Sequence, residues 1–254
     1  QAFKQVDKNL KEYRGFGDEE NYAKAAEALI EQDIFSRFSS LAQRQQAIEQ
    51  RATSKMYDVL ATFKRNLVGE VRNKAQLKNV VREMFGEQTG DASARELAAA
   101  GDAALEDLRL QFNRAGGSIA KNENYGLPQS HDQIQVGKFG KTDWVNYVLK
   151  RLNLDKMIDH ETGLKFTAER LIFALEEVWE TISSGGLNKV KPGAMNSGRK
   201  SLANSRTDHR FLIFKDADAW MEYQTKFGNS NAFDTMLSHI SSMSKEIAQM
   251  DLLG

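Results

Sequence analysis

The sequence predicts an all-α fold of long amphipathic helices and helical hairpins, with two long ordered loops and at most one very short β element. Three observations favour this fold. Only 2 of the 254 residues are proline, which breaks helix interiors. Apolar residues make up 41% of the chain, and they recur at intervals of three, four or seven, as on one helix face. Capping residues and glycines separate these stretches.

Composition excludes several classes of protein. Lys+Arg and Asp+Glu both number 35, so no global attraction to nucleic acid is expected. The absence of cysteine rules out disulfides and thiolate zinc sites. No apolar run approaches the roughly 20 residues of a transmembrane segment. Phosphate-loop, dinucleotide, zinc and nucleophile-elbow motifs are missing, so we predict no cofactor and no metal. Because the chain starts without Met, we expect a fragment of a longer polypeptide.

We divide the sequence into three regions. A long-helix region spans 1–115, a central loop containing glycine and proline spans 116–141, and a helical region spans 142–254, with a basic loop at 185–210. Long polar connections inside compact chains are usually functional or disordered. The central loop contains apolar anchors, so we expect it to be ordered and packed.

The first region is dominated by one predicted helix, from about Asp33 to Val68. At 1.5 Å per residue it would be roughly 50 Å long. Its middle is polar apart from a thin apolar stripe that includes Ala47, Ile48 and Ala52. A narrow stripe favours packing through a narrow seam. Two interpretations stay open, an oligomerisation or lever helix and a long surface helix of a bundle.

The other helices are predicted from caps and apolar periodicity. A helix ending near Arg114 has Gly101 in its middle, where glycine costs about 1 kcal/mol relative to alanine. Either a neighbouring helix approaches closely there, or a side chain is missing. Further helices are expected at 3–13, 19–30 and 70–85, and after caps at Asp91 or Ser93, Thr142 or Asp143, Thr167, Asp216 or Asp218, and Asn229 or Asn231, with Phe211–Phe214 as the best β candidate.

The central loop carries the first set of candidate residues. Gly116 is a natural residue to end the preceding helix. Gly116 and Gly117 therefore lie at a helix C-terminus, the wrong end for the helix dipole to hold phosphate. We predict a structural role for six loop residues: Gly116, Gly117, Tyr125, Gly126, Leu127 and Pro128.

Two pairs of residues are weak candidates for catalysis. His131 and Asp132 could supply a general base and the carboxylate that orients it. His209 and Arg210 could supply an acid or an anion clamp. A catalytic cluster requires the two loops to meet in space. The alternative is that these groups join the two loops by hydrogen bonds, because buried loops must satisfy their polar groups.

The basic loop is the best signal for a partner. Its six cations stand against a single acid, Asp208, for a net charge of +5 in 26 residues. Such a segment can follow a phosphate backbone without reading bases. The alternative is a solvated loop, or arginines paired with acids such as Glu176, Glu177 and Glu180. The candidate phosphate-binding residues are Lys189, Lys191, Arg199, Lys200, Arg206 and Arg210.

Three segments together carry a resemblance to a known class of protein. They are Phe-Asn-Arg-Ala-Gly-Gly-Ser-Ile at 112–119, Tyr-Gly-Leu-Pro-Gln-Ser-His-Asp at 125–132 and Asp-His-Arg-Phe-Leu-Ile-Phe-Lys-Asp-Ala-Asp-Ala-Trp at 208–220. The chain resembles a helical module of very large tailed-bacteriophage (polyvalent) proteins, which are packaged in the virion or ejected with the genome. The resemblance covers about Ala92–Gly254. The module has a bulky aromatic near Gly101, where this chain departs from it.

The resemblance implies a structural segment of an internal virion or DNA-ejection protein. Such a segment would lie inside the capsid or tail, after synthesis in the bacterial host cytoplasm. Its partners would be other virion proteins or copies of itself, with possible DNA backbone contact through the basic loop. The resemblance implies no catalytic residue. The alternative is an enzyme domain, a nuclease or transferase, that uses His131, Asp132, His209 and Arg210.

Overall fold

The computed structural model describes residues 27–31, 39–67, 73–119, 121, 127–159, 162–189 and 212–253. These residues form an all-α fold, as predicted. The elements are α3 (Leu41–Leu67), α4 (Asn73–Met84), α5 (Ala92–Arg114), α6 (Gln133–Phe139), α7 (Lys141–Leu149), η2 (Leu154–Lys156), α8 (Ala168–Ser183), η3 (Leu187–Lys189), α10 (Ala217–Phe227) and α11 (Ala232–Leu253). The helix predicted at 3–13 and most of the one at 19–30 lie outside the described residues.

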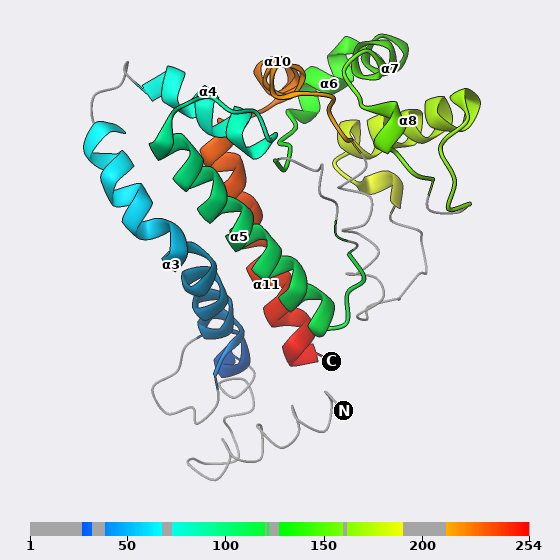
Figure 1. Ribbon diagram of the computed structural model, residues 1–254. Coiled ribbons are helices and arrows are strands. Elements are labelled where there is room, and N and C mark those ends of the chain that lie inside the picture. Colours follow the sequence, from blue (N-terminus) through cyan, green and yellow to red (C-terminus); the bar gives the residue numbers. More distant parts are fainter. Residues whose placement is uncertain are drawn as a thin grey trace, which may run out of the picture.

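Three long helices, α3, α5 and α11, lie side by side and form a stem (Figure 1). The buried positions of α11 include Met236, Ile240, Met243 and Ile247, one helical turn apart. The buried face of α5 is rich in small residues and consists of Ala94, Leu97, Ala98, Gly101, Ala104, Leu105, Leu108 and Phe112. The last helix of the chain therefore shares one core with helices of the first region.

Gly101 lies where neighbouring helices pack tightly against α5. A Cβ atom at this position would lie 3.0 Å from Met236 Sδ on α11 and 3.5 Å from Met84 Cε on α4. The structure therefore supports the close-approach alternative for this mid-helix glycine.

The predicted start of the long helix is wrong. Ser39 and Ser40 are not helical, and α3 begins at Leu41. The Ser40 hydroxyl accepts a hydrogen bond from Gln43 N at 3.2 Å, and the Gln43 side chain accepts one from Ser40 N at 3.0 Å. This reciprocal pair is a capping box, and it sets a helix start that the apolar spacing alone concealed.

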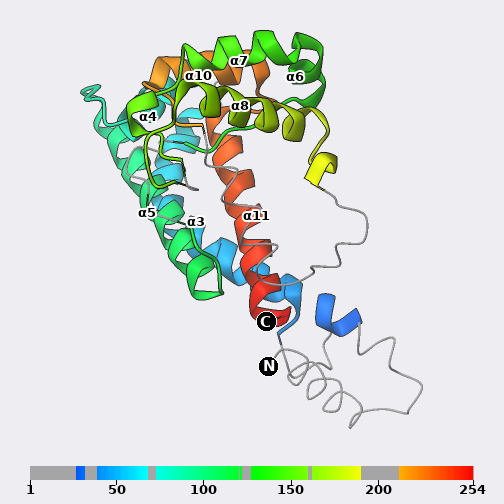
Figure 2. The same cartoon turned by 90° about the vertical axis from the view of Figure 1, so that its right-hand side faces the viewer.

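The helices α6, α7, α8 and α10 gather at one end of the stem, beside α4, and form a head (Figure 2). The head core is aromatic. The Phe227 ring lies edge-on or tilted against Phe139, Tyr147 and Tyr223, with centroid distances of 5.2, 5.3 and 5.2 Å. Helix α10 also joins the head to α4, because Arg82 forms an ion pair with Asp218 at 2.9 Å.

The second half of the predicted central loop is a helix. Asp132 caps α6 by accepting a hydrogen bond from Gln135 N at 2.9 Å. Gly140 adopts φ +86° between α6 and α7. Helix α7 begins at Lys141 without a side-chain cap, so the caps predicted at Thr142 and Asp143 are wrong. Both residues lie inside its first turn.

Other predicted caps are confirmed. The side chains of Asp91, Thr167 and Asp216 accept hydrogen bonds from the third residue after each. Asn231 Oδ1 accepts from Phe233 N and Asp234 N, both at 3.0 Å. The alternative capping-box start at Ser93 is wrong, since Ser93 lies within α5.

The β structure in the described ranges is limited to two isolated antiparallel bridges, which pair Leu152 with Phe214 and Ile158 with Lys165. The first involves the end of the predicted β candidate. None of the helices in these ranges has the length and apolar character that crossing a membrane requires.

Candidate functional site

The first predicted loop motif closes the end of α5. Gly116 has φ +113°, and Gly117 N donates to Phe112 O at 3.0 Å. A Cβ atom on Gly117 would lie 2.2 Å from the Phe112 ring, so only glycine fits there. Asn113 then holds the chain by accepting from Ile119 N at 2.7 Å and donating to Ile119 O at 2.8 Å. The motif is a helix C-cap, as predicted.

The second loop motif is fastened to α10. Leu127 and Pro128 are buried, whereas Tyr125 and Gly126 lie outside the described residues. Gln224 accepts a hydrogen bond from Ser130 N at 3.2 Å and donates one to Ser130 Oγ at 2.9 Å. We call the contact between Leu127–Asp132 and α10 the clasp.

Backbone groups extend the clasp along α10 and past its end. Asp132 N donates to Phe227 O at 2.6 Å, and Asn229 N donates to Ser130 Oγ at 3.2 Å. Gly228 is required between them, because a Cβ there would lie 2.5 Å from Gln224 O. Ser130 therefore holds both α10 and the turn that leads into α11.

His131 has a structural contact in the clasp. Its Nδ1 lies 2.9 Å from the hydroxyl of Tyr223, and the two rings meet edge-on with a centroid distance of 5.7 Å. Tyr223 is fully buried, and burial raises the pKa of its phenol. The hydroxyl therefore stays protonated at neutral pH and serves as a hydrogen-bonding group.

The catalytic candidates fall into two groups. His131 contacts Tyr223 and Asp132 caps α6, so both described candidates have structural partners. His209 and Arg210 lie outside the described residues. The nearest described link between the loops is the hydrogen bond from Gln129 Nε2 to Leu212 O at 3.4 Å. A cluster of all four side chains therefore stays a prediction.

The candidate phosphate-binding residues also lie beyond most of what the structure describes. Lys189 ends η3, and its side chain is not described. Lys191, Arg199, Lys200, Arg206 and Arg210 lie outside the described residues. Phosphate contact by this loop stays a prediction.

Sequence analysis missed the central residue of the clasp, Gln224. The apolar stripe of α10 includes Ala217, Trp220, Tyr223 and Phe227, and Gln224 is buried beside it with 8% exposure. A glutamine next to such a stripe was a usable signal, because buried amides need hydrogen-bonding partners. Its partner Ser130 was not predictable, since 94 residues separate the two.

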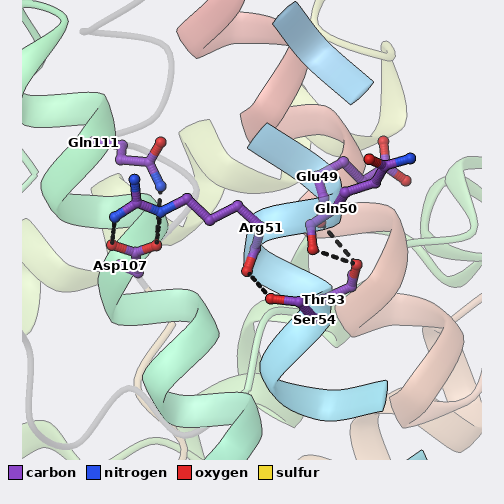
Figure 3. Close-up of polar contacts among 7 residues, drawn as sticks. All are labelled: Glu49, Gln50, Arg51, Thr53, Ser54, Asp107 and Gln111. Carbon is purple, nitrogen blue, oxygen red and sulfur yellow. Dashed lines mark hydrogen bonds and ion pairs between the residues drawn. The ribbon is translucent and has the colours of Figure 1, made fainter. Parts of the chain in front are cut away.

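A second polar site lies on the stem (Figure 3). Arg51 on α3 reaches Asp107 on α5 through two hydrogen bonds of 3.2 and 3.4 Å, and Gln111 donates to the same carboxylate at 3.1 Å. On the other side of α3, Ser241 of α11 donates to Glu49 at 3.1 Å. These pairs link α3 to both of its neighbours in the stem.

A shallow polar pocket of about 290 Å³ lies where α7 ends and α10 begins. Its acids are already engaged: Asp216 caps α10, Asp218 pairs with Arg82 at 2.9 Å, and Glu222 pairs with Arg151 at 2.7 Å. In the described part of the chain, no group of three or more histidines and acids is placed to hold a metal ion. The pocket is lined by Lys150, Arg151, Lys215, Asp216, Asp218, Ala219 and Glu222.

Comparisons with known proteins assign no family to this arrangement. The chain matches no protein-family model, and neither the curated proteins nor the solved structures contain a match to it.

Proposed function

We propose that this chain is a helical structural segment of an internal virion or DNA-ejection protein of a bacteriophage. One observation carries the proposal. The described residues of the two loop motifs form joints, in which Gly117 closes α5 and Ser130 fastens the loop to α10. The motif residues that carry the resemblance thus connect helices to one another, which supports a structural role.

The architecture supports assembly with partners. The stem consists of three long helices lying side by side, and the head lies at one end of it (Figures 1 and 2). We propose other virion proteins or copies of the same chain as partners. The site of action would be the inside of the capsid or tail, after synthesis in the bacterial host cytoplasm.

Quantitative mass spectrometry of purified phage particles tests this proposal. We expect peptides of this chain in the particles at several copies each, together with their loss from particles that have ejected their genome. Infected-cell lysate provides the control for expression. Presence in the lysate combined with absence from washed particles would refute a virion role.

The enzyme alternative, a nuclease or transferase, rests on sequence alone. His131 and Asp132 have structural contacts, and no described observation favours a reaction. A DNA-backbone role for the basic loop makes a separate prediction: binding that weakens steeply with salt, because phosphate contacts release counterions.

A further inference from the structure

The outer face of α8 exposes an aromatic ring. Leu171 and Leu175 face the core, with exposures of 4% and 0%, whereas Phe173 is 62% exposed. A residue advances about 100° around an α-helix, so Phe173 lies on the side opposite these two leucines. A ring in this position contributes nothing to the core of its own head.

Acidic residues surround that ring. Glu169 lies one turn before Phe173, and Glu176 and Glu177 lie one turn after it, which places all of them on neighbouring positions of one face. We call Glu169, Phe173, Glu176, Glu177 and Glu180 the acidic face.

Part of this negative charge has no partner within the described structure. Glu180 pairs with Lys141 at 2.6 Å, and the charge of Glu176 also helps to raise the pKa of Lys141. Arg170 of α8 pairs with the buried carboxylate of Asp159 at 2.6 Å. Glu169 and Glu177 form no ion pair with any described residue. The acidic face therefore combines two carboxylates that lack an ion pair among the described residues with an exposed aromatic ring.

This combination recognises lysine and arginine side chains. Their alkyl stems pack on a ring face, their charged heads are attracted to its π system, and the neighbouring carboxylates accept hydrogen bonds from them. A complementary ligand is a segment rich in Lys and Arg and poor in acids. The chain itself carries one at 185–210, with a net charge of +5.

We propose that the acidic face of α8 binds the basic segment 185–210 of a second copy of the chain. Charge complementarity carries the proposal, which rests on the proposed function by giving its self-assembly a specific contact. One helix face is smaller than the interface of a stable dimer, so each contact is weak. Many copies confined in one particle would multiply its effect.

A charge-swap experiment on the whole chain tests the contact. One variant cancels the four negative charges of the face with Glu176→Lys and Glu177→Lys. The other lowers the net charge of the segment from +5 to +1 with Arg199→Glu and Lys200→Glu. Sedimentation velocity measures self-association at about 0.05 M and about 0.5 M salt, since charge pairs are screened at the higher value. Circular dichroism confirms that each variant keeps its helix content.

We expect the original chain to self-associate at low salt and at least about tenfold less tightly at high salt. Each variant alone should lose most of its association. An equimolar mixture should regain part of it, because the unaltered segment of the first variant then meets the unaltered face of the second. Phe173→Ala should weaken association without lowering the melting temperature. The control Glu96→Lys with Asp251→Lys reverses two exposed acids on α5 and α11, and it should change nothing.

Three results overturn the contact: a chain that is monomeric at both salt concentrations, variants that associate as well as the original, or a mixture that stays dissociated. If the segment pairs with α8 of its own chain instead, the protein stays monomeric at both salt concentrations. None of these results bears on whether the chain is present in the virion. The protein composition of purified particles tests the proposed function separately.

Discussion

The stem and the head of this molecule are held together by different chemistry. In the stem, the helices approach through alanine, glycine and methionine, and the ion pair between Arg51 and Asp107 lies at the edge. In the head, large aromatic side chains fill the core, and polar groups such as Gln224 are buried with their partners. The stem therefore depends on the close fit of its helices, whereas the head depends on the bulk of its aromatic side chains.

The largest effect is expected from removing bulk in the head. Phe227→Ala deletes a ring that is 1% exposed and should destabilise the fold by about 3–5 kcal/mol. Phe173→Ala removes the same atoms from an exposed site and should cost far less. Urea unfolding followed by circular dichroism measures both. Equal losses would contradict the aromatic core of the head.

Adding bulk should break the stem. Gly101→Leu forces a side chain against Met236 and Met84 and should cost about 1–3 kcal/mol, toward the upper end. Gly101→Ala should be nearly neutral, because its gain in helix propensity of about 1 kcal/mol offsets the tight contact. Adding Met236→Ala should recover part of the loss in the leucine variant. Thermal melts compare the series, and a leucine variant as stable as the original would refute the close approach.

Removing the clasp amide should loosen the head locally. Gln224→Ala leaves Ser130 N without its partner and should cost about 1–2 kcal/mol. Hydrogen exchange of the Ser130 and Asn229 amides should accelerate more than exchange in the stem. Thr225→Ala is the matched control, because among the described residues its hydroxyl bonds only to Met221 O of its own helix. Uniform acceleration across both regions would show that the clasp is not a local unit.

Breaking the ion pair of the stem should have a small effect. The Arg51 side chain is 62% exposed, so Arg51→Ala should cost less than about 1 kcal/mol, and less still in high salt. A double-mutant cycle with Asp107→Ala isolates the coupling, and Gln50→Ala provides an exposed control on the same helix. A coupling as large as the loss from Phe227→Ala would invalidate the comparison between the two regions.

The smallest effect concerns a carboxyl of the stem. Burial raises the pKa of Asp102 on α5 to about 6. The folded state therefore favours the protonated carboxyl of Asp102. The stability that this preference contributes is complete below the ordinary Asp pKa and is lost as pH rises through about 6. Asp102→Asn should remove this pH dependence and slightly raise the melting temperature at pH 7. Although neighbouring groups desolvate the carboxyl, the residue as a whole is exposed to solvent, so we expect less than about 1 kcal/mol. If the melting temperatures of both proteins change with pH in the same way between pH 4 and 7, the raised pKa of Asp102 is refuted.

Local chemistry made most helix boundaries predictable. Asp91, Thr167, Asp216 and Asn231 cap helices because a side-chain oxygen can satisfy the free backbone N–H groups of the first turn. The start of α3 was misjudged because apolar spacing was given more weight than the Ser40 capping box.

Long-range contacts explain what sequence analysis missed. Helix α6 has only 7 residues, and it is stabilised from outside, where Trp179 donates to Val136 O at 3.1 Å. His131 was a candidate base, yet its direction is set by Tyr223, which lies 92 residues away. Neither partner can be read from the local pattern around these residues.

The turn at Gly228–Asn231 has a mechanical consequence. Its Asn229 amide is tied to Ser130, while the 22 residues of α11 extend from it over roughly 33 Å. Because α11 packs along α3 and α5, any movement of α10 relative to the stem has to bend the chain at this turn, where Ser130 Oγ accepts hydrogen bonds of 3.2 and 2.9 Å from Asn229 and Gln224. One serine therefore restrains how far the head can rotate about the stem.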